Sequence, residues 1–381
     1  MLCAIQGGMP DHVPLWNLWR TSDIPFHYDN QVERAEGVLA LGLDDTLLLE
    51  PPLNKSEHYD VNQVPHLDIS VHREADEESP YPLLIKDYDT SDGRIRQVVR
   101  RTEDWPYGHD VRLFSDFNVS RSVEFPVKGP EDLPRLRHLL TAHTPEQIAT
   151  FRERATALRR ESQRLDVVLE GGWTVLGDAA LWLLGTERLL LSQMDQPAFV
   201  EELLEIVCQW EMARISLLLN AGVDVIVHSA WYESTDFWTP TNYHQMLKPR
   251  LKRMIDLVHD AGAHFSYICT TSWQPLTDDL IDLQIDSLMG VDPVQGRADL
   301  AKTRRDLGEY MCLWGGLNGA LTLGEGSTEE ICQATQAAIR TLGPDGGFVL
   351  YPVDQLVAGT PWKNVRAMID CWREVGSYPI G

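Results

Sequence analysis

A regular alternation of short apolar runs with helical segments constrains the fold of this chain more than any other feature. From about residue 164 onward, six runs of strand length recur, and helical patterns separate them. The runs are "DVVLEGG" (166–172), "DVIVHSAWY" (224–232), "HFSYICT" (264–270), "SLMGVDP" (287–293), "YMCLWGGLNG" (310–319) and "GFVLYP" (347–352). This order is typical of consecutive βα units that build a parallel sheet.

Two further apolar runs precede these six, "VPLWNLW" (13–19) and "DDTLLLEP" (44–51), joined by the helical "NQVERAEGVLALG". Eight strand candidates with intervening helices in a chain of 381 residues predict an α/β fold, a (β/α)8 TIM-type barrel. A doubly wound open sheet is the main alternative. We expect a single barrel domain over residues 1–381.

The interval 52–130 interrupts this rhythm. "YPLLIKDYDTSDGRIRQVVRR" is typical of a hairpin that turns at Ser91, Asp92 and Gly93. The interval therefore reads as an insertion after the second strand. Since loops after barrel strands converge on the catalytic mouth, we expect it to roof the substrate site.

Composition excludes several classes of partner. The formal net charge of −24 would repel nucleic acid over most of the surface. No stretch approaches the roughly 18 apolar residues of a membrane helix, so we expect a cytoplasmic protein that binds no membrane. The six cysteines are dispersed without a CxxC spacing, and we expect no disulfide framework.

The predicted C-terminal strand ends, where a barrel builds its active site, are rich in aromatic and polar residues. Seven tryptophans fall there: Trp16, Trp19, Trp173, Trp231, Trp238, Trp273 and Trp314. Such indoles make an apolar, flat-walled cavity, although any one of them could instead pack beneath the rim. The predicted substrate-binding residues are Trp16, Trp19, Arg20, Trp173, Trp231, Trp238 and Asn318. Asn318 and Asp292 either hold substrate or tie strand ends together.

Several longer segments carry a family resemblance. They are "VEFPVKGPEDLPRL", "GVDVIVHSAWYESTDFWTPTNYHQMLKPRLKRMIDLVHDAG", "DSLMGVDPVQGRADLAKTRRDLG", "CLWGGLNG" and "AIRTLGPDGGFVLYPVDQL". Together they resemble the uroporphyrinogen decarboxylase superfamily, which includes cobalamin-dependent methyltransferases. The resemblance covers most of the chain and implies the barrel fold independently of the strand count.

The chain departs from the decarboxylase pattern of that superfamily. The arginine-bearing segment after the first strand corresponds to "PLWNLWRTSDIPFHY", in which Arg20 alone remains. None of the 12 histidines lies beyond His264, whereas the decarboxylases place one after the eighth strand. A porphyrinogen with many carboxylates would meet a cavity short of cations, which makes decarboxylation the runner-up function.

The methyltransferase branch that methylates thiols carries zinc on a His-x-Cys pair of the fifth strand and on a cysteine after the eighth. Here Tyr267-Ile268-Cys269 stands at the pair, and "VLYPVDQL" contains no cysteine. We therefore do not predict that zinc centre in its usual form. A metal held by Cys269 together with His228 or Glu233 stays open.

The resemblance implies a corrinoid-dependent methyltransferase. It would demethylate a small donor, either a methoxylated aromatic or a methylamine-type compound, and pass the methyl group to a cobalamin-carrying partner protein. A poor leaving group needs a proton, for which Tyr267, Glu233 and Asp236 are the candidates. A ligand-binding barrel without catalysis is the alternative from another class, and a homodimer is left open.

Alternation along residues 264–269 predicts which side chains face the barrel interior. We expect Tyr267 and Cys269 to point into the cavity and Ile268 to face the surrounding helices.

Overall fold

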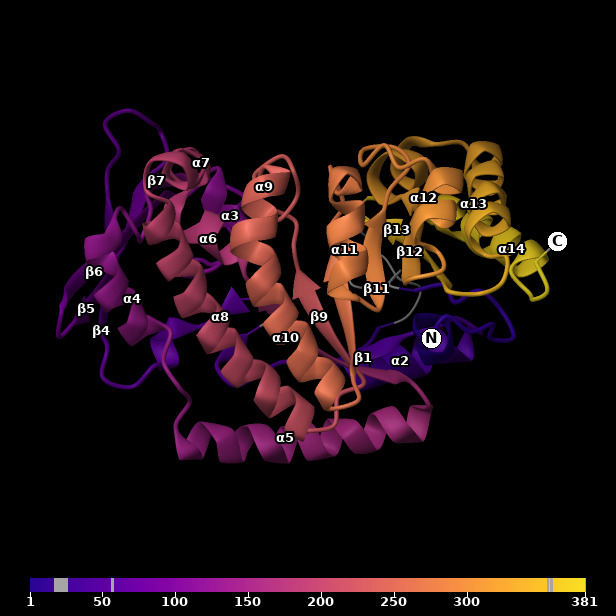
Figure 1. Cartoon of the computed structure of the whole chain (residues 1–381), viewed down its shortest axis with the longest axis horizontal. Coiled ribbons are helices and arrows are strands. Elements are labelled where there is room, and N and C mark those ends of the chain that lie inside the picture. Colours follow the sequence, from indigo (N-terminus) through magenta and orange to yellow (C-terminus); the bar gives the residue numbers. More distant parts are fainter. Residues whose placement is uncertain (17–26, 56–57, 355, 357–358, 381) are drawn as a thin grey trace.

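The computed structural model describes residues 1–16, 27–55, 58–354, 356 and 359–380. Its centre is a curled sheet whose strands follow one another in chain order, all pairing in parallel (Figure 1). In order they are β1 (Thr46–Leu49), β8 (Val168–Val175), β9 (Val225–Ser229), β10 (His264–Ile268), β11 (Ser287–Val291), β12 (Cys312–Asn318) and β13 (Phe348–Val353). A doubly wound sheet would reverse its strand order, so this sequential order favours the barrel.

The segment at residues 13–16 lies between the two edges of this sheet. Leu15 forms a parallel bridge with Leu350, and the Trp16 amide donates to the Leu350 carbonyl at 3.1 Å. On the other side the Trp16 indole donates to the Thr46 hydroxyl of β1 at 3.0 Å. The first predicted strand is thus reduced to a single bridge in the described part, and the arrangement is that of a (β/α)8 barrel.

The helices surround the sheet, with α5 running across the N-terminal ends of the strands (Figure 1). Their bounds are α1 Leu2–Ile5, α2 Gln31–Ala40, α3 Asp116–Val119, α4 Leu133–Leu139, α5 Pro145–Leu165, α6 Gly177–Leu184, α7 Thr186–Asp195, α8 Pro197–Asn220, α9 Pro240–Asn242, α10 Lys248–Asp260, α11 Thr277–Leu283, α12 Leu300–Leu307, α13 Thr328–Leu342 and α14 Trp362–Val375. Shorter 3-10 turns η1 Val61–Gln63, η2 Pro130–Asp132 and η4 Gln274–Leu276, and π-helical turns η3 Tyr243–Leu247 and η5 Gly319–Leu323, complete the set. Among the described helices, none combines the length and apolarity that crossing a membrane requires.

Alternate residues of the barrel strands belong to two separate cores. Val227, Ile268 and Met289 belong to an inner cluster that includes Trp16 and Trp173. Their neighbours along the strands, such as Ile226, belong to the outer cluster between the strands and the helices. Because both faces of a barrel strand are buried, each strand contributes to both cores.

The insertion contains two small antiparallel sheets. The first pairs β2 (Asn54–Lys55) with β3 (His58–Tyr59), and the second orders β4 (Asp68–Glu74), β5 (Leu83–Thr90), β6 (Gly93–Arg100) and β7 (Ser122–Glu124). The predicted hairpin is confirmed, since Thr90 pairs with Gly93 across its turn. The larger sheet lies to one side of the barrel beside α4, and α3 contacts α6 (Figure 1). That the insertion roofs the substrate site stays a prediction.

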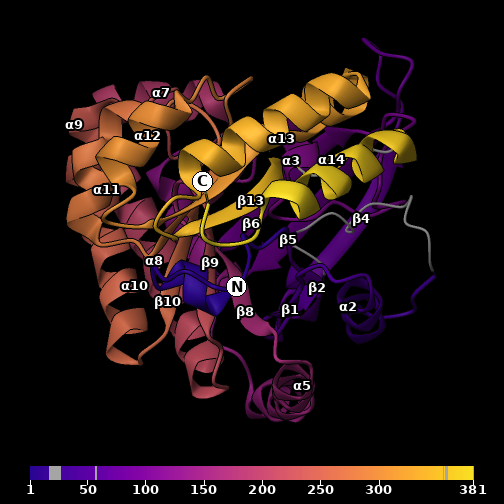
Figure 2. The same cartoon turned by 90° about the vertical axis from the view of Figure 1, so that its right-hand side faces the viewer.

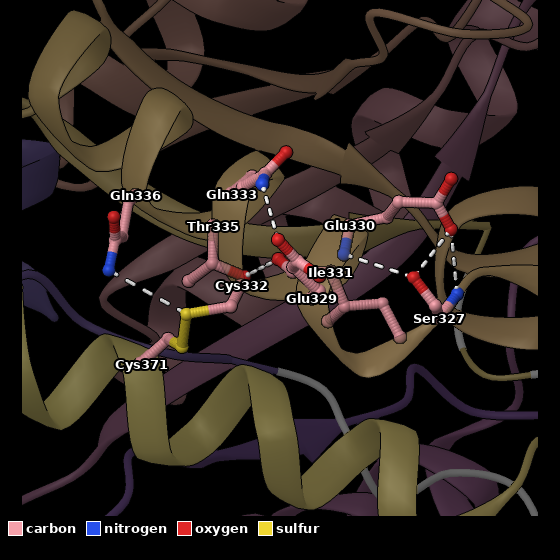
Figure 3. Close-up of a disulfide and its surroundings, with 9 residues drawn as sticks. All are labelled: Ser327, Glu329, Glu330, Ile331, Cys332, Gln333, Thr335, Gln336 and Cys371. Atoms are coloured by element: carbon pink, nitrogen blue, oxygen red, sulfur yellow. Dashed lines mark hydrogen bonds between the residues drawn. A yellow bond between two sulfur atoms is a disulfide. The ribbon is translucent and has the colours of Figure 1, made fainter.

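One cysteine pair departs from the expectation of no disulfide framework. Cys332 of α13 and Cys371 of α14 form a disulfide with a Cα–Cα distance of 5.5 Å (Figure 3). The two helices lie side by side on the outside of the barrel (Figure 2). A separation of 39 residues gives no sequence signal for pairing, because the contact arises only from helix packing.

Candidate active site

A cavity of about 120 Å³ lies among inward-facing side chains toward the C-terminal ends of the barrel strands. Its walls are Trp16, Trp173, Trp231, Ile268, Thr270, Met289, Tyr351 and Asp354. Because active sites of barrel enzymes are built at this end, we take this cavity, called the mouth below, as the candidate active site.

Aromatic rings make up half of these wall residues, and they pack against one another. The Trp173 and Trp231 rings have centroids 5.4 Å apart and a tilt of 46°. Trp16 lies edge-on to Tyr351 at 5.4 Å and to the buried Trp314 at 4.9 Å. These contacts fix the indoles, so the mouth is a rigid aromatic cavity. The predicted aromatic mouth is present, with Trp16, Trp173 and Trp231 in its walls.

Asp354 supplies the acidic group of the mouth. It follows β13 in the left-handed backbone conformation, with φ of 63°, which Asp tolerates better than most residues. Asp354 is an exposed residue at the edge of the mouth. Its neighbours still remove part of the water around the carboxyl, which raises the pKa of Asp354, and the negative charge of Asp292 raises it further. No Lys or Arg is among the wall residues that the structure describes.

The predicted orientation of the fifth strand is wrong. Ile268 lines the mouth, whereas Tyr267 and Cys269 lie in the outer core. The side chains of the strand do alternate between the two faces, but the faces are exchanged relative to the prediction. Ser266 and Ile268 face the interior of the barrel, and the Ser266 hydroxyl pairs with that of Ser287 at 2.6 Å. Polarity could not set the phase, since both faces of the strand are buried.

Tyr267 joins a buried hydrogen-bond network behind the mouth. Its hydroxyl donates to Glu233 Oε2 at 2.8 Å and lies 3.3 Å from the Tyr243 hydroxyl. Glu233 Oε1 accepts from the Gly177 amide at 2.7 Å and lies 3.1 Å from His228 Nε2. Glu233 and His228 are fully buried. The network therefore ties β9 and β10 to the start of α6.

The hydrogen-bond partners in this network indicate which atoms donate and which accept. With His228 Nε2 donating to Glu233, Nδ1 accepts from the Thr174 hydroxyl at 2.9 Å, so both ring nitrogens are satisfied. Burial raises the pKa of Tyr267 well above its usual range, and the Glu233 charge raises it further. The Tyr267 hydroxyl keeps its proton and uses it to hold Glu233.

The candidate metal ligands do not converge. The Cys269 thiol lies 3.6 Å from the Thr271 carbonyl, and burial raises its pKa well above the usual range, which disfavours the thiolate that zinc binds. His228 has both nitrogens engaged. Within the described ranges no group of three or more His, Cys, Asp or Glu residues could hold a metal ion. These residues do not fit zinc.

Asp236 lies outside the mouth. Its carboxylate accepts from the hydroxyls of Ser272 at 2.7 Å and Thr271 at 3.1 Å. It borders a second cavity, of about 550 Å³, which is lined by the loops after β10 and β11 and by α12. This cavity is larger than the mouth but lies beside the barrel rather than at its axis, so we do not assign the chemistry to it.

Of the remaining predicted residues, two make structural contacts and two lie outside the described residues. Trp238 is fully buried in the outer core, and its indole donates to the Tyr232 carbonyl at 2.8 Å. Asn318 donates to both Asp292 and Gln295 at 2.8 Å, so it ties strand ends together, as one of the two alternatives proposed. Trp19 and Arg20 lie outside the described residues.

Asp178 is an important residue that sequence reasoning missed. It is fully buried in α6 and accepts from the Ser229 hydroxyl and the Tyr232 amide, both at 2.7 Å, and from the Trp231 amide at 3.2 Å. It therefore positions the loop that carries Trp231 into the mouth. An acid among the apolar residues of "GDAALWLLG" was the only signal in the sequence.

Comparisons with known proteins agree with the resemblance seen in the sequence. The family model described as "Uroporphyrinogen decarboxylase (URO-D)" matches residues 108–375, more than half of the chain. The "Methylcobamide:CoM methyltransferase MtaA" of Methanosarcina barkeri is 23% identical over 216 residues, which are 56% of this chain and 60% of that protein. The chain thus spans less than two thirds of that relative's length.

A solved structure supports the fold over nearly the whole chain. The structure described as "methyltransferase from Methanosarcina mazei" is 18% identical, with a TM-score of 0.58, and the match covers 98% of this chain and 97% of the other. At this identity the match speaks for the barrel fold alone.

Proposed function

Because this chain belongs to the uroporphyrinogen decarboxylase family, we propose that it is a corrinoid-dependent methyltransferase. It takes a methyl group from a small donor held in the mouth and delivers it to cobalamin on a separate corrinoid protein. The similarity to the Methylcobamide:CoM methyltransferase MtaA of Methanosarcina barkeri supports this branch of the family.

The observation that carries the proposal is the composition of the mouth. Half of the described wall residues are aromatic, one is a carboxylate and none is a cation. A porphyrinogen with several carboxylates would be repelled by Asp354 and would find no described partner for its charges. An apolar cavity with few polar groups instead suits a small methylated donor.

The residues of this chain bind and orient the donor. The aromatic walls exclude water from the methyl group, and Asp178 holds Trp231 in place through the backbone of its loop. The corrinoid, when bound, supplies a strong nucleophile for methyl groups. The catalytic roles suggested for Tyr267, Glu233 and Asp236 stay predictions, and the geometry favours a positioning role for Tyr267 and Glu233.

The test is methyl transfer to cobalamin reduced to Co(I), with methoxylated aromatics, methylamines and quaternary ammonium compounds as donors. Formation of methylcobalamin from at least one donor is expected, and a mouth variant such as Trp173→Leu should reduce it. Absence of methyl transfer across the panel would contradict the proposal.

A ligand-binding barrel without catalysis is the second candidate. The observation in its favour is that Tyr267, Glu233 and His228 satisfy one another's hydrogen bonds and lie behind the mouth. Thermal stabilisation by a donor that is never turned over with reduced cobalamin would favour this candidate.

A further inference from the structure

We infer that the mouth is a binding site for a methylated ammonium cation, so that the methyl donor is a quaternary ammonium compound rather than a methoxylated aromatic. This inference deepens the proposed function and rests on it for the reaction. It rests on the walls of the mouth for the binding.

The arrangement of rings and charge is that of a cation site. Trp16, Trp173, Trp231 and Tyr351 present aromatic rings to one small cavity, and Asp354 adds a carboxylate at its edge. The electron-rich faces of aromatic rings attract quaternary ammonium ions, each contact contributing about 0.5–2 kcal/mol. A neutral donor would use the rings but would have no need of the carboxylate.

A second carboxylate, Asp292, lies near enough to Asp354 to act on it. Asp354 and Asp292 repel each other, which helps to raise the pKa of Asp354. In the described hydrogen bonds, the Asp292 carboxylate accepts from two uncharged groups, the Asn318 side-chain amide and the Val294 backbone amide, both at 2.8 Å. A bound cation would relieve this repulsion. The net charge of −24 would also draw cations toward the protein.

The mouth is small enough to take one reacting group. An apolar cavity of about 150 Å³ holds one benzene molecule, and the mouth measures about 120 Å³. A trimethylammonium group fits a space of this size, while the rest of the donor molecule extends out of the mouth.

The chemistry of a quaternary donor also suits the mouth. As the C–N bond breaks, its electron pair stays on nitrogen and a neutral tertiary amine leaves, while the reduced corrinoid of the partner protein provides the electron pair for the new bond to methyl. No proton is required, in contrast to a departing phenolate. The neutral product loses its attraction to Asp354, which favours its release.

The inference is tested by calorimetric titration of the whole chain with choline and with 3,3-dimethylbutan-1-ol, its neutral analogue of the same shape, at constant chloride. We expect choline to bind at least about tenfold more tightly. Equal affinity for the two compounds would overturn the inference.

Two pairs of variants locate the site. Asp354→Asn and Trp231→Leu should each weaken choline binding about tenfold or more, whereas Trp231→Phe, which keeps a ring, should weaken it less. Asp345→Asn is the matched control. Like Asp354, Asp345 is exposed and has a positive φ, here of 66°, but it precedes β13 whereas Asp354 follows it. Unchanged choline affinity in Asp354→Asn would overturn the inference, even if Trp231→Leu failed to fold.

Turnover separates this inference from the proposed function. Choline binding that depends on Asp354, without methyl transfer from any donor, would support the cation site and contradict the methyltransferase. Methyl transfer from methoxylated aromatics, with no choline binding, would support the methyltransferase and overturn the cation site.

Discussion

The mouth and the network behind it are built from adjacent residues of the same strands but differ in how their polar groups are used. In the mouth, Trp173 and Ile268 leave a small cavity and Asp354 has a raised pKa. One residue away, Thr174 and Tyr267 belong to a buried network in which donors meet acceptors. The comparison shows that the face of the strand to which a polar side chain points decides its role near a barrel mouth. One set is available to a ligand, and the other fixes the strand ends.

The largest expected effect comes from the centre of the network. Glu233→Ala removes the acceptor for Tyr267 and the Gly177 amide and leaves both donors buried. We expect the free energy of unfolding to fall by about 3–5 kcal/mol, measured by urea denaturation. Glu201→Ala, at an exposed position of α8, should change it by no more than about 0.5 kcal/mol. A loss for Glu233→Ala as small as that of the control would break the comparison.

Asp178→Asn tests the link between the two regions. The amide offers one oxygen, so one of the groups that Asp178 now accepts from, including the Trp231 and Tyr232 amides, would face an N–H instead. We expect a loss of about 1–3 kcal/mol in the free energy of unfolding. Because Trp231 would also shift, choline affinity should fall in the folded variant. Full choline affinity there would show that Asp178 does not position the mouth.

Tyr267→Phe asks whether the network also takes part in catalysis. The variant keeps the ring and loses the bond to Glu233, so the unfolding free energy should fall by about 1 kcal/mol. Turnover should change less than tenfold, because the hydroxyl lies in the outer core. Tyr310→Phe, at an exposed position, is the control. A loss of about 10²-fold in turnover would instead restore the role of proton donor first suggested by the sequence.

The sequence predicted the barrel because hydrophobic periodicity and strand spacing are local signals. The βα alternation after residue 164 and the hairpin of the insertion are both present in the structure. Trp16, Trp173 and Trp231 also lie at the mouth, as the count of strand ends along the chain indicated, while their role in binding substrate stays a prediction.

The phase of the fifth strand could not be predicted. "HFSYICT" places apolar and polar residues on both faces, and only the packing of neighbouring strands decides that Ser266 faces Ser287 and that Ile268 lines the mouth. Asp178 was missed for a similar reason. Its partners, the Ser229 hydroxyl and the amides of residues 231 and 232, lie about fifty residues away in sequence.

The smallest expected effect concerns the stability of the mouth, and its sign is opposite to that in the network. A carboxyl whose pKa is raised on folding adds stability below its unfolded pKa and loses that contribution as pH rises through the folded pKa. At neutral pH the charged Asp354 therefore costs stability, but water screens most of this cost because the residue is exposed. Asp354→Asn should raise the unfolding free energy by no more than about 0.5 kcal/mol. The gain should vanish as pH is lowered below the unfolded pKa of about 3.9.

Choline affinity of the unaltered protein should fall over the same acidic range, as Asp354 takes up a proton, while the choline affinity of Asp354→Asn stays low and does not change with pH. Denaturation and titration at a series of pH values would measure both. A loss of stability in Asp354→Asn at neutral pH would place Asp354 with the structural residues and remove the distinction between the two regions.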